Sequence, residues 1–188
     1  GTWEEGTGAD AADGGQLEVL QWARENGAPW DASTCRGAAE GGHFEVLQWA
    51  RANGCPWDEW ALYLAAKKGH EVVVRALIEL GANVNKAADV DKAKANGVTP
   101  LFIAAEKGHE TVVRALLETG TYVNRASDDG RTPLYTAAEN GHETVVRALI
   151  EADADVSKAD DNGLTPLFMA AQNGHAAIVQ ILGAAGAA

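Results

Sequence analysis

The sequence predicts an all-α solenoid in which short helical hairpins stack in a row, and two periodicities predict it. The segment TPLFIAAEKGHETVVRALLETG begins at Thr99 and returns in closely similar form at Thr132 and Thr165, with a regular 33-residue step. The segment GGQLEVLQWARENGAPWD begins at Gly14 and returns at Gly41, with a 27-residue step. Repeats of this length are single supersecondary units that cannot bury their apolar side alone, so neighbouring units must stack.

Each 33-residue repeat contains the signals of two helices joined by a tight turn. Thr99 is a residue that caps helix N-termini, and the proline after it suits the first helical position because it has no N–H to leave unpaired. Gly108 is suited to a left-handed residue that ends this first helix. A second helix follows from His109 or Glu110, and its apolar residues fall on one face in the helical period.

These residues resemble the ankyrin repeat, whose signature combines a TPLH-type helix start, paired alanines and a GH turn. Phe102, Tyr135 and Phe168 stand where the motif has its histidine. The resemblance implies an all-α ankyrin-repeat solenoid with short β-hairpin loops in the C-terminal repeats. One solenoid is expected over residues 1–188, with repeats near 3–29, 30–56, 57–95, 96–128, 129–161 and 162–188.

The N-terminal repeats are shorter, and the sequence P-W-D stands where the longer repeats place their hairpin. They resemble the shortened ankyrin-like repeats that carry NGCPWD. All six tryptophans lie at or before Trp60. Because tryptophan supplies a large buried area, we expect these aromatic residues to be mostly core. Trp60 breaks the register and sits where Thr99 sits, so it is either a further packing residue or a contact for a partner.

The third repeat is longer than the full repeats that follow it, and the extra residues lie near 90–95. Lys92 and Lys94 lie in this insertion and stand out in an acidic chain. Two interpretations remain open: a solvated loop extension, which a solenoid tolerates, or a projecting finger that contacts a partner.

Composition excludes several classes of function. Apolar residues make up 46% and the net charge is −12, so the chain is globular and repels phosphate backbones and anionic membranes. We therefore expect no nucleic-acid partner and no membrane insertion, and a basic peptide or protein face is favoured electrostatically. Cys35 and Cys55 have no metal-type spacing and fit buried free thiols in an intracellular, cytoplasmic setting. The chain begins with Gly1 rather than Met, so we expect either an engineered segment or a fragment of a longer protein.

The chain contains no recognisable catalytic or metal-binding motif. Its five histidines all occupy the GH position, which indicates a structural role in hydrogen bonding between adjacent turns. They are His43, His70, His109, His142 and His175. The expectation is a non-enzymatic protein without a cofactor.

The C-terminal end is unusual because residues 162–188 include no Asp, Glu, Lys or Arg. Terminal repeats normally present a polar face to water. Three explanations remain open: the natural chain continues, another subunit covers this end, or the end frays. The first two are favoured.

The resemblance implies that partners dock on the concave face, which consists of hairpin tips and the exposed side of the first helices. Only a few residues dominate any interface, so at most about a third of that face should matter. Carried over to this chain, with Trp60, Lys92 and Lys94 added, the expected face comprises Lys67, Lys68, Asn96, Val98, Glu106, Lys107, Asp128, Asp129, Arg131, Tyr135, Glu139, Asn140, Asp161, Asn162, Leu164, Gln172 and Asn173.

The favoured function is a non-catalytic protein-interaction module that binds a protein or peptide. The alternative is a structural or assembly subunit whose apolar C-terminal end is covered by a partner or by further repeats.

Overall fold

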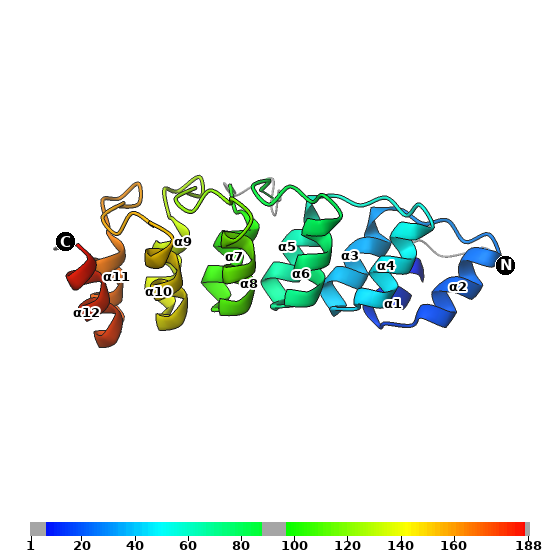
Figure 1. Ribbon diagram of the computed structural model, residues 1–188, viewed down its shortest axis with the longest axis horizontal. Coiled ribbons are helices and arrows are strands. Elements are labelled where there is room, and N and C mark those ends of the chain that lie inside the picture. The colour runs from blue at the N-terminus through cyan, green and yellow to red at the C-terminus, as the bar shows by residue number, and fades with distance from the viewer. Residues whose placement is uncertain (1–6, 88–96, 187–188) are drawn as a thin grey trace. The chain divides into compact units, whose positions relative to one another are not determined.

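The computed structural model describes residues 7–87 and 97–186 of the chain. Over these ranges the chain forms twelve α-helices and no strand (Figure 1). The helices fall into two compact units, Gly1–Asn83 and Val84–Ala188. No described helix is long and apolar enough to cross a membrane.

Unit 1 contains three helical hairpins in which each first helix packs on the first helix of the next hairpin. Helix α1 packs on α3, and α3 packs on α5. Each second helix packs on its own first helix. The helices are α1 (Thr7–Asp13), α2 (Leu17–Glu25), α3 (Ala32–Gly41), α4 (Phe44–Ala52), α5 (Glu59–Lys68) and α6 (Glu71–Glu79).

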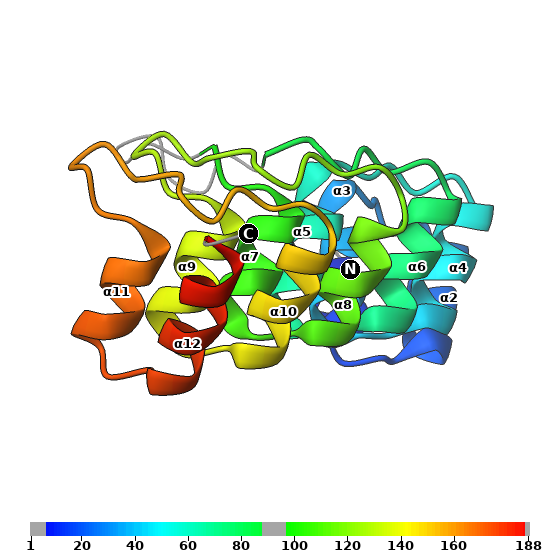
Figure 2. The same ribbon diagram turned by 60° about the vertical axis from the view of Figure 1, so that its left-hand side comes forward.

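Unit 2 repeats this arrangement. Figure 2 shows α7, α9 and α11 in one row and α8, α10 and α12 in a second row beside it, in agreement with the helix contacts. The helices are α7 (Pro100–Lys107), α8 (Glu110–Leu117), α9 (Pro133–Asn140), α10 (Glu143–Glu151), α11 (Pro166–Gln172) and α12 (Ala176–Ala185). Stacked helical hairpins are therefore confirmed in each unit, and their continuation as one solenoid over residues 1–188 stays a prediction.

The expected helix signals are confirmed in unit 2. The hydroxyl oxygen of Thr132 accepts a hydrogen bond from the backbone N–H of Tyr135 at 3.1 Å, and Thr99 and Thr165 cap their helices in the same way. Gly108 ends α7 with a left-handed φ of 75°. Asp153 also adopts a left-handed backbone, with a φ of 60°. The paired alanines are completely buried in α7 and α9, which allows their first helices to approach closely.

The PWD segments replace the missing hairpins through two contacts that the sequence alone did not reveal. Asp58 caps α5 by accepting a hydrogen bond from the backbone N–H of Trp60 at 3.1 Å. Arg51 donates a hydrogen bond to the carbonyl oxygen of Cys55, and its guanidinium lies 4.9 Å from the centre of the Trp57 ring. Arg24, Ala28 and Trp30 form the same arrangement one repeat earlier. Each PWD corner is thus held by an arginine from the preceding helix.

The prediction that the tryptophans belong to the core is wrong for the described part of the chain. Trp22 is 58% exposed, and Trp30, Trp49 and Trp57 are half-buried. Trp30 and Trp49 meet edge to face with ring centres 5.6 Å apart. An arginine guanidinium lies over the ring of Trp30 and another over the ring of Trp57. Trp3 lies outside the described residues.

The C-terminal repeats were expected to have short β-hairpin loops, and these reduce to single closed turns. In one turn the N–H of Ser127 donates to the carbonyl of Arg131 at 2.9 Å, and the N–H of Gly130 donates to Ser127 at 3.0 Å. Asp160 and Leu164 close the equivalent turn of the next repeat. The hydrogen bonds of these turns do not extend into a β-ladder, so the described residues contain no strand.

Two further expectations are confirmed. The Nε2 atoms of four of the five GH histidines pair with a backbone carbonyl of the preceding repeat at 2.7–3.0 Å. Cys35 and Cys55 are free and completely buried. The hydrogen bond with Cys55, together with burial, raises the pKa of the Cys35 thiol.

Candidate functional site

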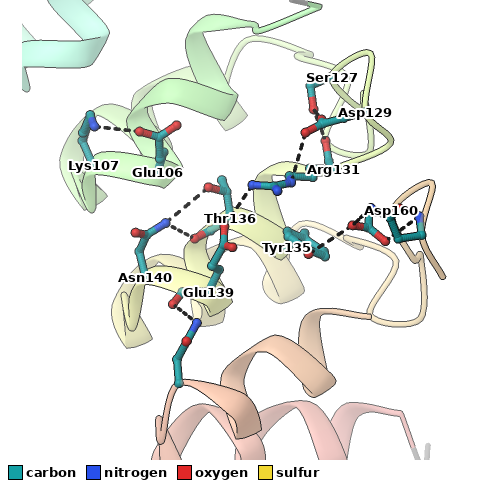
Figure 3. Close-up of polar contacts among 12 residues, drawn as sticks. Glu106, Lys107, Ser127, Asp129, Arg131, Tyr135, Thr136, Glu139, Asn140 and Asp160 are labelled. Atoms are coloured by element: carbon teal, nitrogen blue, oxygen red, sulfur yellow. Dashed lines mark hydrogen bonds and ion pairs between the residues drawn. The ribbon is translucent and has the colours of Figure 1, made fainter. Parts of the chain in front are cut away.

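A groove on the turn side of α7 and α9 gathers polar side chains in unit 2 (Figure 3). Its volume is about 400 Å³. Helix α7 contributes two side chains, the turn before α9 contributes three, and α9 contributes three more. We call it the acidic groove, and it is lined by Val98, Phe102, Glu106, Ser127, Asp129, Arg131, Thr136, Glu139 and Asn140.

Three carboxylates and one guanidinium give the lining a net negative charge. Arg131 lies between two of the carboxylates, with Nε 3.1 Å from Asp129 and Nη1 3.4 Å from Glu139. The Nε contact is an ion pair without hydrogen-bond geometry, since this buried nitrogen has no hydrogen-bond partner. Glu106 pairs with Lys107 at the rim, at 2.6 Å. Arg131 and Lys107 together offset two of the three carboxylates, so the groove keeps a net negative charge.

Arg131 also contacts Tyr135, a residue of α9. The guanidinium lies 5.5 Å from the centre of the Tyr135 ring, and the Tyr135 hydroxyl donates a hydrogen bond to Asp160 at 3.3 Å. Burial, with the nearby charge of Asp160, raises the pKa of Tyr135 to about 12. Burial alone would raise the pKa of Asp160, but hydrogen bonds from Leu164 and Asn162 lower it overall. Tyr135 is thus a neutral donor to an ionised carboxylate.

Tyr135 corrects one expectation about the binding face. It was expected to contact a partner, but it is only 1% exposed and its hydroxyl is used by Asp160. The reason is the following repeat, since α11 packs on α9. Tyr135 supports the groove from below and does not line it.

The structure brings six of the expected residues together in the acidic groove: Val98, Glu106, Asp129, Arg131, Glu139 and Asn140. Lys107 stands at its rim. Phe102, Ser127 and Thr136 also line the groove and were missed. The spacing of the repeat was the available signal for Phe102 and Thr136, because each stands on a first helix one turn before an expected groove residue.

The remaining expected residues of unit 2 lie outside the groove. Asp128, Asp161 and Asn162 are exposed at turn tips, and Leu164 is half-buried while its N–H donates to Asp160. Gln172 and Asn173 are exposed at the end of α11, where Asn173 donates to the carbonyl of Glu139 at 2.9 Å. Lys92, Lys94 and Asn96, with the whole insertion, lie outside the described residues.

Unit 1 has a second hollow, of about 380 Å³, which Trp60 lines together with Asp10, Arg36 and Glu40. Trp60 is half-buried and meets Tyr63 edge to face at 5.6 Å. Arg36 lies 5.9 Å from the centre of the Trp60 ring while it pairs with Asp58. Lys68 pairs with Glu40 at 3.3 Å and Lys67 is half-buried. The hollow therefore already holds its own cations.

The described residues contain no group of three His, Cys, Asp or Glu side chains that could hold a metal ion. The Nε2 atoms of four histidines are used by backbone carbonyls of neighbouring repeats.

Stacked helical hairpins with GH turns paired between repeats define a helical-repeat protein. Comparison with protein families matches the model of ankyrin repeats (3 copies) to residues 35–127 and 122–188. This chain belongs to the ankyrin-repeat family. Ankyrin repeats are generally protein–protein interaction modules and typically non-catalytic. No curated protein matches the chain.

Proposed function

We propose that this protein binds a basic peptide or protein segment in the acidic groove without catalysing a reaction. The observation that carries the proposal is the convergence of Glu106, Asp129 and Glu139 from three separate elements around one hollow that contains one cation. Carboxylates that face each other across a groove accept hydrogen bonds from guanidinium or ammonium groups, and these charge-assisted bonds are the stronger kind.

The rest of the chain supports this choice of partner. The net charge of −12 attracts cationic segments and accelerates their encounter with the protein. Phe102 and Val98 provide apolar surface beside the carboxylates, which suits the aliphatic stem of lysine or arginine. Arg131 connects the turn to α9 through its ion pair with Glu139 and its contact with the Tyr135 ring.

Selection from a pool of random displayed peptides tests the proposal. We expect the selected peptides to be enriched in arginine and lysine. Their affinity should fall as salt rises from about 0.05 to about 0.5 M, because added salt shortens the Debye length and so screens the attraction between the charges. Selected peptides that carry no excess of basic residues would refute the proposed partner class.

Matched variants locate the site. Glu139→Gln and Glu106→Gln each remove one groove carboxylate and should weaken binding of a selected peptide by about threefold to tenfold, the effect of one charge-assisted hydrogen bond at a partly exposed site. Glu143→Gln removes the same charge from α10, where Glu143 pairs with Arg147, and should change the affinity less than about twofold. Equal effects of all three variants would show that binding depends on net charge and not on the groove.

A further inference from the structure

The two cysteines of the chain lie together in unit 1, at the start of α3 and at the corner that follows α4. Cys35 and Cys55 are the only cysteines of the sequence, and both side chains are 0% exposed. The Cys55 thiol donates a hydrogen bond to the carbonyl oxygen of Asp31 at 3.4 Å. Because Asp31 is the N-cap of α3, the Cys55 sulfur lies at the first turn of the helix that carries Cys35.

The two sulfurs are also bonded to each other, since the Cys35 thiol donates a hydrogen bond to Cys55. A disulfide S–S bond is about 2.05 Å long, so thiols in hydrogen-bond contact need to approach by only about 1–2 Å to form one. Cys55 is tied to the end of α4, because its N–H donates to the carbonyl of Ala50 at 2.9 Å and its own carbonyl accepts from Arg51. The fold thus brings together two thiols that are 20 positions apart in the sequence.

Packing does not require thiols at these two positions. The following repeat has Leu62 and Ala82 there, 27 residues on. The backbone is the same in both repeats, because the N–H of Ala82 donates to the carbonyl of Leu77 at 2.9 Å, as Cys55 does to Ala50. A pair of apolar side chains therefore fills in one repeat the place that a pair of thiols fills in the other, and the thiols add a chemistry that the fold does not need.

The two thiols are not equivalent, and Cys55 is the one suited to react first. The hydrogen bond from Cys35 lowers the pKa of Cys55, and contacts with Thr34 and the charge of Arg51 lower it further against the opposing effect of burial. The same hydrogen bond, together with burial, raises the pKa of Cys35. Because the thiolate is the nucleophile in thiol–disulfide exchange, Cys55 is the attacking sulfur and Cys35 the resolving one.

We propose that Cys35 and Cys55 are a redox modification site, at which a small-molecule disulfide oxidises them to a reversible intramolecular disulfide. With glutathione disulfide, the Cys55 thiolate attacks one sulfur, a mixed disulfide forms and one glutathione thiolate leaves. The Cys35 thiol loses its proton, its sulfur attacks Cys55, and the second glutathione leaves. Two protein thiols are oxidised and one reagent disulfide is reduced, with two protons passing from the protein to the two glutathione thiolates.

Burial sets the rate of this reaction and not its equilibrium. Gly54 and Pro56, on either side of Cys55, are exposed at the corner, so a local opening of the corner presents the sulfur to the reagent. The product cross-links α3 to the corner and closes a short loop, which restricts the unfolded chain more than the folded one. The inference concerns unit 1 and does not rest on peptide binding in the acidic groove of unit 2.

Equilibration of the wild-type protein in mixtures of reduced and oxidised glutathione tests the proposal. The protein is brought to the same disulfide fraction from the reduced and the oxidised side, quenched by alkylation and analysed by mass spectrometry. The fraction gives the effective concentration of one thiol at the other. We expect this concentration to be about 100-fold higher in the folded protein than in urea that unfolds it, which is the loop-closure effect for a loop of this size.

Tryptophan fluorescence provides a second readout that is specific for unit 1, because all six tryptophans lie at or before Trp60. The midpoint of urea unfolding should be about 1 M higher for the oxidised than for the reduced protein, since the disulfide stabilises the folded unit by the same factor. Cys35→Ala and Cys55→Ala are the matched controls. Each keeps one thiol, so treatment with glutathione disulfide should leave its midpoint unchanged.

Two results would overturn the proposal. The first is an effective concentration in the folded protein that does not exceed the value in urea, because the native geometry would then oppose the bond. The second is a product that consists of a stable glutathione adduct or a dimer linked between chains, because the two sulfurs would then not react with each other. Both results come from the wild-type protein and do not depend on whether the alanine variants fold.

Discussion

Asp153 occupies a position at which other repeats have glycine, Gly81 and Gly120 among them, and replacing it tests whether the chain stores backbone strain there. Asp153 has a φ of 60°, while Gly81 and Gly120 have 91° and 76°. A Cβ atom added to either glycine would meet nothing within 4 Å. Space is therefore not limiting at this position, and the difference between aspartate and glycine lies in the backbone.

The magnitude follows from two opposing terms. A non-glycine residue in the left-handed region costs about 1–2 kcal/mol. Glycine gives back about 0.5–1 kcal/mol because it increases the entropy of the unfolded chain. Asp153→Gly should therefore raise the free energy of unfolding by about 0.5–1 kcal/mol. Gly120→Asp should lower it by a similar amount.

Urea unfolding followed by far-UV circular dichroism measures the change. With an m-value of about 2 kcal/mol/M, the midpoint should rise by about 0.25–0.5 M with no change in slope. Asp153→Asn is the matched control: it removes the negative charge and keeps a side chain that tolerates this backbone, so any effect of charge alone appears there. A gain from Asp153→Asn as large as that from Asp153→Gly would assign the effect to charge and would refute the strain argument.

Three further predictions concern single side chains. Subtracting the ultraviolet titration of Tyr135→Phe from that of the wild type should show the Tyr135 phenol ionising near pH 12. Because the pKa of Tyr135 is raised above its usual value of 10, the neutral phenol stabilises the folded state below pH 10, and this stabilisation is lost as pH rises toward 12. Denaturant unfolding followed by tryptophan fluorescence should show that Arg51→Lys lowers the free energy of unfolding by about 1 kcal/mol, because lysine lacks the flat guanidinium that lies over Trp57 and bonds the carbonyl of Cys55. The control Arg75→Lys, at the exposed ion pair with Glu71 on α6, should lower it less. Asp31→Ala removes the N-cap of α3 and should lower the free energy of unfolding by about 1 kcal/mol at neutral pH. Because hydrogen bonds from Ser33 lower the pKa of Asp31, this loss should shrink as pH falls through the lowered pKa. A loss that does not change with pH would contradict the capping role of the Asp31 carboxylate.

The helical hairpins were predictable because their signals are local. Thr132 and Pro133 begin a helix through one side-chain oxygen and one missing N–H, and Gly141 ends it through its own φ. The histidines were also predictable as structural residues, since a side chain that returns with each repeat serves a contact that returns with each repeat.

Part of the candidate site was predictable for the same reason. Glu106 and Glu139 stand at equivalent positions of successive repeats, so their shared face follows from the 33-residue step. The groove itself was not predictable, because it depends on Arg131 lying between Asp129 and Glu139, a contact made across a turn whose shape is set by packing.

The sequence by itself determined the repeat, the order of helices, the absence of charge at the C-terminal end and the negative charge that favours a basic partner. The tertiary structure decided which side chains remain accessible. Tyr135 and Phe168 occupy the same position of the repeat, yet one is buried and the other is half exposed, because a following helix covers α9 and no described helix covers α11. Trp57 is likewise half-buried beside the guanidinium of Arg51, and Trp22 is exposed, although both are residues of the kind that fills cores. Exposure depends on what packs against a residue, and a local pattern does not contain that information.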